Sequence, residues 1–220
     1  MKIAICIPCH RDTKARFTHA LAGMAIHAAR EIPDEIKTIL AQGPLLEVRE
    51  GLVHAARGWG ADWILWLDAD HTFPNETLVR LLGHGKDVVA CNYPRRAGAP
   101  EPVAQRNGRL VQTTEALARR GAVEPVDAVG LGICLMRASV FDRLDPPYFQ
   151  LELKPDGSGY VSEDFTLFRR LKRAGVTPYV DHGLSWKIGH IGDLILTTAA
   201  MAGGARPTPA DDTFPDAFST

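Results

Sequence analysis

The sequence predicts an α/β protein whose mostly parallel central sheet is flanked by helices. Over residues 1–93, four short apolar runs of strand length alternate with three segments that carry apolar residues at helical spacing. This alternation is typical of a parallel sheet covered by helices. The third run, Trp63–Leu67, is apolar throughout, as expected for a central strand that is buried on both faces.

The first half of the chain carries clear signals for the ends of its elements. Pro8 ends the first strand, Gly43 and Pro44 follow the second, and Gly83 lies where the third helix ends. Pro74 lies where that helix begins, and proline is common in a first helical turn. We expect strands at residues 2–8, 36–40, 63–67 and 87–92, and helices at residues 17–30, 45–58 and 74–83.

After residue 93 the pattern changes and predicts a smaller region of short strands. Asn107 and Gly108 favour a tight hairpin turn. Gly130 and Gly132 interrupt a strand, where glycine often marks the close approach of a ligand or of backbone. Ser162 suits the cap of a helix whose first turn is acidic. The expected elements are a hairpin at 103–111, a strand at 126–136, a short helix at 139–144, a long loop at 145–161 of the kind that is functional or disordered, a helix at 162–174, a strand at 176–180 and a closing helix at 194–201.

The composition excludes several classes of protein. The chain has 220 residues, enough for one ordinary domain, and its 45% apolar and 23% charged residues are typical of a globular protein. A formal net charge of −1 provides no overall basic field for binding nucleic acid. No apolar run approaches the roughly 20 residues of a membrane-spanning helix. We therefore expect a cytoplasmic protein without membrane contact, and we read the first residues as a strand, not a signal peptide.

The four cysteines are expected to be buried and unreactive. Cys6 and Cys9 have the spacing of a redox or zinc motif, but Cys6 lies within a strand run and no second pair of this kind follows. Small buried hydrophobic residues are therefore the better interpretation.

Two carboxylates directly follow the buried third strand. Asp68 and Asp70 point to the same side if the strand conformation continues through them, because successive side chains alternate. In open α/β sheets, ligands bind beyond the carboxyl ends of the strands, and two acidic groups there can hold a hard divalent cation. The alternative is that both residues only end the strand or cap the next helix.

Several motifs follow one another in an order that points to a known family. They are a first strand that ends at Pro8, Asp68-Ala69-Asp70 after its apolar strand, the run Val129–Arg137, the acidic motif Ser162-Glu163-Asp164, and His190-Ile191-Gly192. Over most of residues 2–192 the chain resembles GT-A glycosyltransferases, and it is most similar to family 2 and to small phage-type relatives. The resemblance implies the GT-A (Rossmann-like) fold with a smaller β region on the acceptor side. It also implies a UDP- or GDP-linked sugar donor and Mn2+ or Mg2+ as cofactor.

The resemblance further implies metal ligands and a catalytic base. Asp70 is expected to be the main metal ligand, Asp68 to bind the metal, the ribose or the sugar, and His190 to be a third ligand. The metal would stabilise the negative charge that the leaving diphosphate gains. Asp164 is expected to remove the proton of the acceptor hydroxyl, with Glu163 as the alternative base. The two acids could also merely favour the start of a helix, and His190 could be a structural residue.

Contacts to the donor and the acceptor are implied as well. The loop after the first strand and the end of the second strand are expected to flank the nucleobase, and Arg49 to meet the diphosphate. Relatives often have an acidic residue where this chain has Gln42, and Asn where it has Glu50. The residues expected at the donor are Pro8, His10, Arg11, Gln42, Arg49, Ala69, Gly130 and Gly132. Those expected at the acceptor are Tyr93, Arg95, Arg96 and Trp186, of which the two arginines could also bind the diphosphate, while His71 and His182 are expected to be structural.

The expected organisation is one catalytic domain over residues 1–202 and a flexible tail over residues 203–220, which are rich in Gly, Pro, Thr and Asp. Residues 1–93 would form the nucleotide-sugar-binding half and residues 94–202 the acceptor-binding half. The acceptor stays open among a glycan, a small molecule, a protein and a hydroxylated DNA base of the phage type, and a homodimer is compatible with these expectations.

Asp68 and Asp70 also fit other classes of protein. In haloacid-dehalogenase-type phosphatases an apolar strand is followed by Asp-x-Asp-x-Thr, which Asp68, Asp70 and Thr72 match, and Asp68 would form an aspartyl-phosphate. That motif normally lies on the first strand, whereas here two strand–helix units precede it. A nucleotidyltransferase would share the fold, but its Gly-rich amino-terminal signature is missing from this sequence. A non-catalytic nucleotide- or glycan-binding module would keep Asp70 without needing Asp164.

Overall fold

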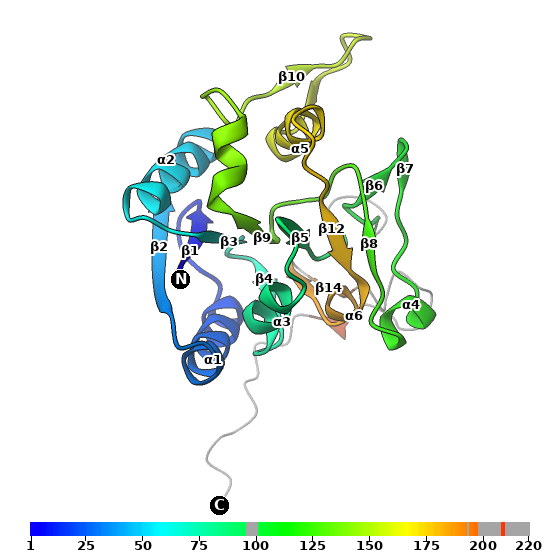
Figure 1. Cartoon of the computed structure of the whole chain (residues 1–220). Helices are drawn as coiled ribbons and strands as arrows, with labels where there is room; N and C mark the ends of the chain where they lie inside the picture. The colour runs from blue at the N-terminus through cyan, green and yellow to red at the C-terminus, as the bar shows by residue number, and fades with distance from the viewer. Residues whose placement is uncertain (96–100, 193, 198–207, 210–220) are drawn as a thin grey trace, which may run out of the picture.

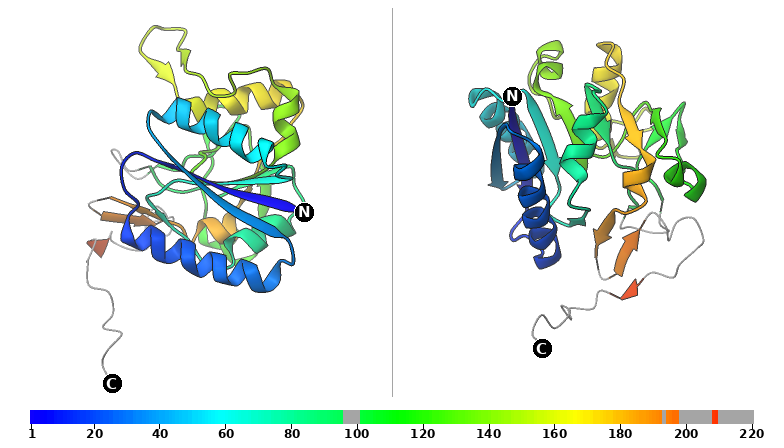
Figure 2. Two further views of the ribbon diagram at one scale, coloured as in Figure 1. Left: turned by 90° about the vertical axis from the view of Figure 1, so that its left-hand side faces the viewer. Right: turned by 60° about the horizontal axis from the view of Figure 1, so that its bottom comes forward.

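The protein forms three layers, with a twisted sheet between two layers of helices (Figure 1, Figure 2). This computed structural model describes residues 1–95, 101–192, 194–197 and 208–209. Helices α2 (Leu45–Gly58) and α5 (Glu163–Arg173) cover one face of the sheet, and α1 (Ala15–Glu31) and α3 (Thr77–Gly83) cover the other. The α/β architecture predicted from the sequence is confirmed.

The central sheet has seven strands in the order β2-β1-β3-β9-β5-β12-β8. Its strands are β1 (Lys2–Cys9), β2 (Glu35–Gln42), β3 (Trp63–Leu67), β5 (Val88–Ala90), β8 (Val123–Pro125), β9 (Ile133–Arg137) and β12 (Tyr179–Asp181). Strands β2, β1 and β3 are parallel, as are β5 and β12, whereas β9 runs antiparallel to β3 and β5, and β8 antiparallel to β12. The sheet is therefore mostly parallel, as the sequence predicted.

Apolar periodicity accounts for the elements that enclose the core. Helix α1 buries Phe17, Ala20, Met24 and Ala28, which are spaced at three or four residues and so share one helix face. Strand β3 is buried along its whole length. Shorter helices are α4 (Glu115–Arg119), α6 (His182–Ser185) and a 3-10 helix at Ala138–Arg143. None of the helices within the described residues has the length and apolar character needed to cross a membrane.

A smaller β region lies beside the central sheet and completes the candidate site. Its four strands are β4 (His71–Thr72), β13 (Gly189–Ile191), β14 (Leu194–Thr197) and β15 (Thr208–Pro209). Strand β13 pairs with both β4 and β14, and its register with β4 places His190 opposite His71. Two hairpins are formed by β6 (Gln105–Arg106) with β7 (Arg109–Leu110), and by β10 (Glu152–Leu153) with β11 (Tyr160–Val161).

Several expectations for the second half need correction. Residues 194–197 form strand β14 and do not begin a closing helix, because this short apolar run, which contains Ile195 and Thr197, pairs with β13. Residues 198–201 lie outside the described residues. The strand expected at 126–136 is confined to Ile133–Arg137, since two glycines precede it, and the expected loop at 145–161 contains the β10–β11 hairpin. Apart from β15, the expected flexible tail lies outside the described residues, and the division into two halves stays a prediction.

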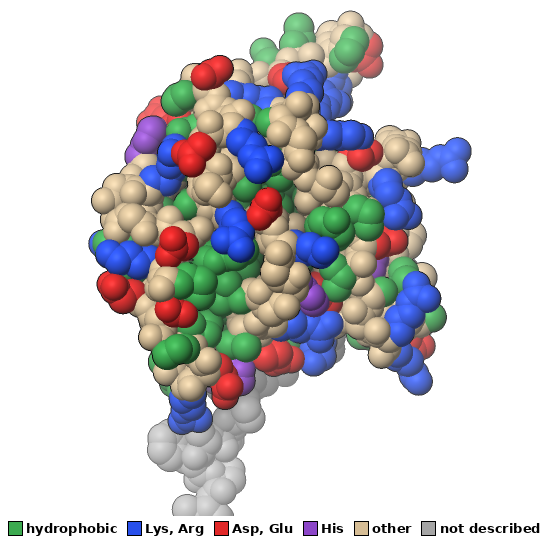
Figure 3. All heavy atoms as spheres, in the orientation of Figure 1, with side chains coloured by type: hydrophobic (Ala, Val, Ile, Leu, Met, Phe, Trp, Pro, Cys, Tyr) green, Lys and Arg blue, Asp and Glu red, His purple; other side chains and the backbone are tan. Residues whose placement is uncertain are grey.

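The interior and the surface agree with what the composition predicted. All four cysteines are buried free thiols, as expected for small hydrophobic residues. On the face shown in Figure 3, basic and acidic side chains are interspersed, which fits the net charge of −1.

A buried carboxylate, Asp181, fastens α3 to the end of β12. Its side chain is fully buried and accepts hydrogen bonds from Arg80 Nη2 at 2.7 Å, His84 Nε2 at 2.8 Å and Leu184 N at 2.9 Å. Burial would raise the pKa of Asp181, but the bonds from Arg80, Leu184 and His84 outweigh burial and lower the pKa below its usual value. These contacts therefore favour the ionised carboxylate.

We expect Asp181→Asn to lower the free energy of unfolding by about 3 kcal/mol at pH 7, because it removes the buried charge that Arg80 and His84 contact. The matched control is Asp87→Asn, which removes an exposed pair with Arg137 and should cost less than about 1 kcal/mol. Because the folded pKa of Asp181 is depressed, its stabilisation is present above the unfolded pKa of about 3.9 and is lost as the pH falls through the folded value. Urea unfolding from pH 7 downward measures this, and equal effects of the two variants would contradict it.

Candidate functional site

The carboxyl end of β3 delivers two carboxylates to separate partners. The strand ends at Leu67 and the chain turns at Ala69 and Asp70. The expectation that Asp68 and Asp70 point to the same side required the strand to continue through them, and it does not. Asp68 Oδ1 accepts a hydrogen bond from Arg49 Nη2 at 3.3 Å. Asp70 Oδ1 instead faces two imidazole rings.

Asp70, His71 and His190 form a compact group of metal-ligating side chains, named here the Asp-His-His cluster. One ligand atom from each lies within 4.8 Å of the others. The pairing of β4 with β13 places the two histidines opposite each other, and their rings stack with centroids 4.2 Å apart and planes inclined by 19°. Asp68, a predicted metal ligand, is not part of the cluster.

A hydrogen bond to Pro94 orients the ring of His190. Nδ1 lies 2.8 Å from the carbonyl oxygen of Pro94, which can only accept, so Nδ1 donates and Nε2 is the nitrogen that faces Asp70. Nε2 lies 3.6 Å from Asp70 Oδ1. Burial would raise the pKa of Asp70, but its contacts with His190 and His71 lower the pKa well below its usual value.

His71 supplies a second nitrogen to the same point. It is 1% exposed, and neither ring nitrogen has a hydrogen-bond partner among the described residues, although Nδ1 lies 3.1 Å from Asp70 Oδ1. One carboxylate and two imidazoles in this arrangement fit a divalent cation such as Mn2+. The sequence predicts only a structural role for His71, and its one signal is its position directly after Asp70.

Two glycines make room for the wall of the cluster. Tyr93 is buried, its Oη accepts a hydrogen bond from Gly132 N at 2.8 Å, and its ring packs edge-on against His71 with centroids 4.4 Å apart. A Cβ on Gly132 would lie 2.6 Å from Tyr93 Oη and 2.7 Å from His71 Cε1, and one on Gly130 would lie 2.2 Å from Tyr93 Oη. The close approach that the glycines predict is thus made by Tyr93 and His71. Burial, followed by nearby Asp68 and Asp164, raises the pKa of Tyr93 well above its usual value.

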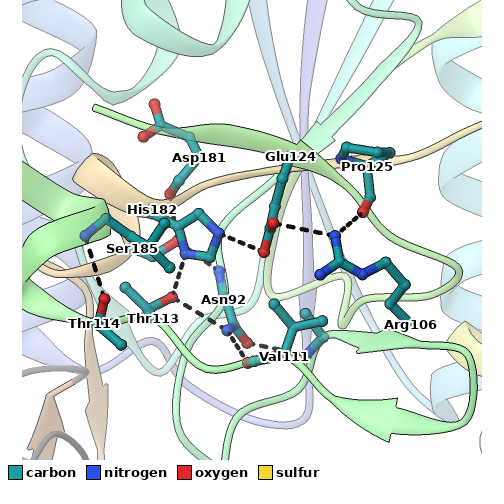
Figure 4. Close-up of polar contacts among 12 residues, drawn as sticks. Asn92, Arg106, Val111, Thr113, Thr114, Glu124, Pro125, Asp181, His182 and Ser185 are labelled. Atoms are coloured by element: carbon teal, nitrogen blue, oxygen red, sulfur yellow. Dashed lines mark hydrogen bonds and ion pairs between the residues drawn. The ribbon is translucent and has the colours of Figure 1, made fainter. Parts of the chain in front are cut away.

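A buried polar network fixes the segment that carries Tyr93 and Pro94 (Figure 4). Asn92 is fully buried, and its side-chain amide donates to Val111 O at 2.7 Å and to Thr113 Oγ1 at 3.2 Å. His182 continues the network with Nδ1 2.8 Å from Thr113 Oγ1 and Nε2 3.0 Å from Glu124 Oε1. The network therefore lies immediately before Tyr93 and Pro94, whose carbonyl contacts His190, and no local sequence pattern predicts these bonds.

A buried guanidinium joins Asp68 to the acidic motif on α5. Arg49 is 3% exposed, and its Nη1 donates to Glu163 Oε1 at 2.7 Å. Burial would lower the pKa of Arg49, but the carboxylates of Asp68, Glu163 and Asp164 raise it above its usual value. Burial raises the pKa of Glu163, with Arg49 acting against it. The sequence predicts a contact of Arg49 with the diphosphate, whereas the structure places its guanidinium between two acids.

Asp164 stands beside this ion cluster in the first turn of α5. It is half-buried, and its Oδ1 accepts hydrogen bonds from Ser162 Oγ and from Phe165 N, the latter at 2.7 Å. Arg95 approaches the same helix end, with its guanidinium 6.0 Å from the centre of the Phe165 ring. Arg96 lies outside the described residues. Trp186 is half-buried at the end of α6, and among the described residues no hydrogen bond or ring contact joins it to the Asp-His-His cluster.

A cavity of about 640 Å³ lies at the carboxyl ends of β1 and β2. It is lined by Pro8, Cys9, His10, Gly43, Pro44, Leu45 and Val48. The loop after β1 and the turn after β2, which the sequence predicts on either side of a nucleobase, thus meet in one hollow, and the Gln42 side-chain amide donates to the carbonyl of Arg11 beside it. The volume lies within the range of small-molecule sites. Cys9, Leu45 and Val48 carry no signal in the sequence that marks them as lining residues.

Known structures resemble the chain although no family model and no curated protein sequence matches it. Protein A197 from STIV is similar over 98% of this chain and 97% of its own, with a TM-score of 0.62 and 15% identity. GalNAc-T7, solved with UDP, GalNAc and Mn2+, is similar over 87% of this chain but 44% of its own, with a TM-score of 0.58 and 12% identity. A mutant of Drosophila β1,4-galactosyltransferase 7, solved with manganese, UDP-Gal and xylobiose, is similar over 87% of this chain and 71% of its own, with a TM-score of 0.50 and 14% identity. The chain therefore has the GT-A fold, as the sequence predicted.

We expect Gly132→Ala to lower the affinity for Mn2+ at least about tenfold, because the new methyl group would displace Tyr93 and His71, and groups that orient metal ligands carry effects of this size. Gly51→Ala is the control, since a Cβ there meets no atom within 4 Å. Titration followed by electron paramagnetic resonance of free Mn2+ measures both. Equal affinities of the two variants would contradict the prediction, and a wild-type protein without saturable Mn2+ binding would contradict the metal site.

Proposed function

We propose that this protein is a metal-dependent glycosyltransferase that moves a sugar from a nucleoside-diphosphate-sugar donor to a hydroxyl acceptor. The observation that carries the proposal is the joint position of two features within a GT-A fold. The Asp-His-His cluster begins just after β3, and the cavity lies at the ends of β1, which is next to β3 in the sheet, and of β2. Ligands of open α/β sheets bind at such carboxyl ends, so a nucleotide in the cavity would have its phosphates near the cluster.

Asp70, His71 and His190 would hold the cation. Two nitrogen ligands favour Mn2+ over Mg2+, which prefers oxygen ligands. GalNAc-T7 and the Drosophila galactosyltransferase were both solved with manganese. When bound, the metal compensates the charge that the leaving diphosphate develops. The Pro94 carbonyl prepares the site, because it keeps the proton of His190 on Nδ1 and leaves Nε2 to bind.

The cavity would take the nucleobase and ribose of a UDP- or GDP-linked sugar. Pro8 and Leu45 offer apolar surface for a base, and His10 offers a polar group. The bond between Gln42 and Arg11 holds together the two loops that form its sides. Asp68, at the end of the neighbouring strand, would accept a hydrogen bond from a ribose or sugar hydroxyl.

Asp164 would act as the base that accepts the proton of the attacking acceptor hydroxyl. Glu163 is the less suitable candidate, because its Oε1 is bonded to Arg49 at 2.7 Å and its side chain is 12% exposed. Asp164 is half-buried at the same helix end and makes its contacts to Ser162 and Phe165 through Oδ1.

The acceptor stays open among a glycan, a small molecule, a protein and a hydroxylated DNA base. Arg95, beside the start of α5, would suit an anionic acceptor. A phosphatase with Asp68 as nucleophile is less well supported, since Oδ1 of Asp68 is the acceptor of a hydrogen bond from Arg49 and the motif lies on the third strand. A binding module without catalysis would bind the donor but not turn it over.

A matching donor together with Mn2+ should raise the melting temperature by about 5–10 °C. A ligand at one hundred times its Kd stabilises the folded state by about 2.7 kcal/mol, and each kcal/mol shifts a domain of this size by about 2–4 °C. Differential scanning fluorimetry over a panel of UDP- and GDP-linked sugars, with and without Mn2+, measures the shift. Leu45→Trp, which fills the cavity, and Asp70→Asn, which removes a metal ligand, should each abolish it.

Leu40→Trp and Asp156→Asn are the matched controls, because both residues are exposed and belong to neither the cavity nor the cluster. Both variants should keep the full shift. A panel in which no sugar nucleotide stabilises the wild-type protein would sink the proposed function. Phosphate release from phosphomonoesters that disappears in Asp68→Asn would favour the phosphatase instead.

Asp164→Asn should keep the thermal shift with the donor and reduce turnover at least about 100-fold, the lower range of general-base contributions. Turnover is measured as release of the nucleoside diphosphate, with mass spectrometry of the sugar product. Asp156→Asn again serves as the control of the same substitution. Unchanged turnover in Asp164→Asn would rule out this residue as the base.

A further inference from the structure

Arg49 interrupts the apolar inner face of α2. The helix otherwise buries Val48, Leu52, Val53 and Ala56, and Arg49 lies among them with 3% of its surface exposed. Taking a guanidinium out of water is costly unless it is paired and hydrogen-bonded. The packing of α2 alone therefore does not explain a buried arginine at residue 49.

The explanation lies in the two carboxylates that the guanidinium joins. Nη1 donates to Glu163, the first residue of α5, at 2.7 Å, and Nη2 donates to Asp68, the first residue after β3, at 3.3 Å. The two nitrogens belong to one rigid, planar group, so the separation of the two carboxylates is set by covalent geometry. The partners lie 114 and 19 residues away in the sequence, and Arg49 links their elements directly.

We propose that Arg49 is a positioning residue, which sets the separation between the metal side and the base side of the candidate site. Asp68 precedes Asp70 of the Asp-His-His cluster by two residues, and Glu163 is followed by Asp164, the proposed base. The inference rests on the proposed function and deepens it, because it gives Arg49 a role that involves no contact with the donor. The 4% exposure of its side chain fits a role of this kind.

The geometry of the contact is specific to arginine. A lysine at residue 49 would retain the positive charge, but a single ammonium group cannot hold two carboxylates in the fixed geometry of the guanidinium. The substitution Arg49→Lys therefore keeps the positive charge at residue 49 and removes the fixed spacing between the two carboxylates. Arg49→Met removes the charge and leaves an apolar chain in its place.

The contact itself can be tested without any substrate. Arg49→Met should lower the melting temperature by at least about 5 °C, because it leaves Glu163 buried without its cation. Adding Glu163→Gln should restore at least half of that loss, since it removes the uncompensated charge. A double variant that recovers nothing would overturn the contact.

Arg49→Lys tests the role of the contact in the reaction. With the donor that stabilises the wild-type protein, kcat should fall about 100-fold, the size of effect that a misplacement of about 1 Å produces. The KM for the donor and the affinity for Mn2+ should each stay within about threefold, because Arg49→Lys leaves the cavity and the cluster intact. Arg57→Lys on the same helix is the control, since Arg57 donates to Tyr148 and Asp142, outside the site, and its kcat should not fall.

Two kinetic results would overturn the proposal. A donor KM that rises tenfold with unchanged kcat would make Arg49 a donor ligand, and a wild-type kcat in Arg49→Lys would leave it no positioning role. Failure of the proposed function looks different, because then no sugar nucleotide stabilises the wild-type protein. In that case, recovery of the melting temperature in the double variant would still support the link between Arg49 and Glu163.

Discussion

The antiparallel pairing of β4 with β13 is the constraint on which the candidate site depends. It sets His71 opposite His190, and beside it Ile191 N donates to Asp70 O at 2.7 Å. A strand of two residues has little stability of its own, so the surrounding residues must fix the register. Tyr93 packs edge-on against both imidazole rings, and the Pro94 carbonyl holds His190. The packing of the chain itself therefore preorganises the Asp-His-His cluster.

Charge balance is the second constraint on the site. The end of β3 and the start of α5 contribute four carboxylates, whereas one buried guanidinium, Arg49, faces two of them. Asp70 lies apart from Arg49 and faces the imidazole rings of His71 and His190. The charged side chains near the end of β3 therefore form two sets, one around Arg49 and one around Asp70.

Local signals predicted the parts of the site that lie within single elements. The apolar run before Asp68, the acidic helix start at Glu163 and Asp164, and the late His190 can each be recognised from neighbouring residues. His71 could not be assigned in this way, because its role depends on the register of two short strands far apart in the sequence. The burial of Arg49 likewise depends on partners 19 and 114 residues away. Strand β14 was mistaken for a helix because a short apolar run has no periodicity that separates the two.

Gly132 shows why the core and the site cannot be varied independently. Its carbonyl accepts a hydrogen bond from Asp68 N at 2.9 Å, and its own N–H donates to Tyr93 Oη at 2.8 Å. It directly precedes β9, whose first residue pairs with the last residue of β3. A side chain at residue 132 would press on both Tyr93 and His71, and it would disturb the backbone that positions Asp68. The sequence predicts the approach of a ligand or of backbone at this glycine, whereas the groups that lie against it are the side chains of Tyr93 and His71; a donor contact of Gly132 stays a prediction. Because Gly132 has no side chain, the ring of His71 can lie against it with Nδ1 facing Asp70.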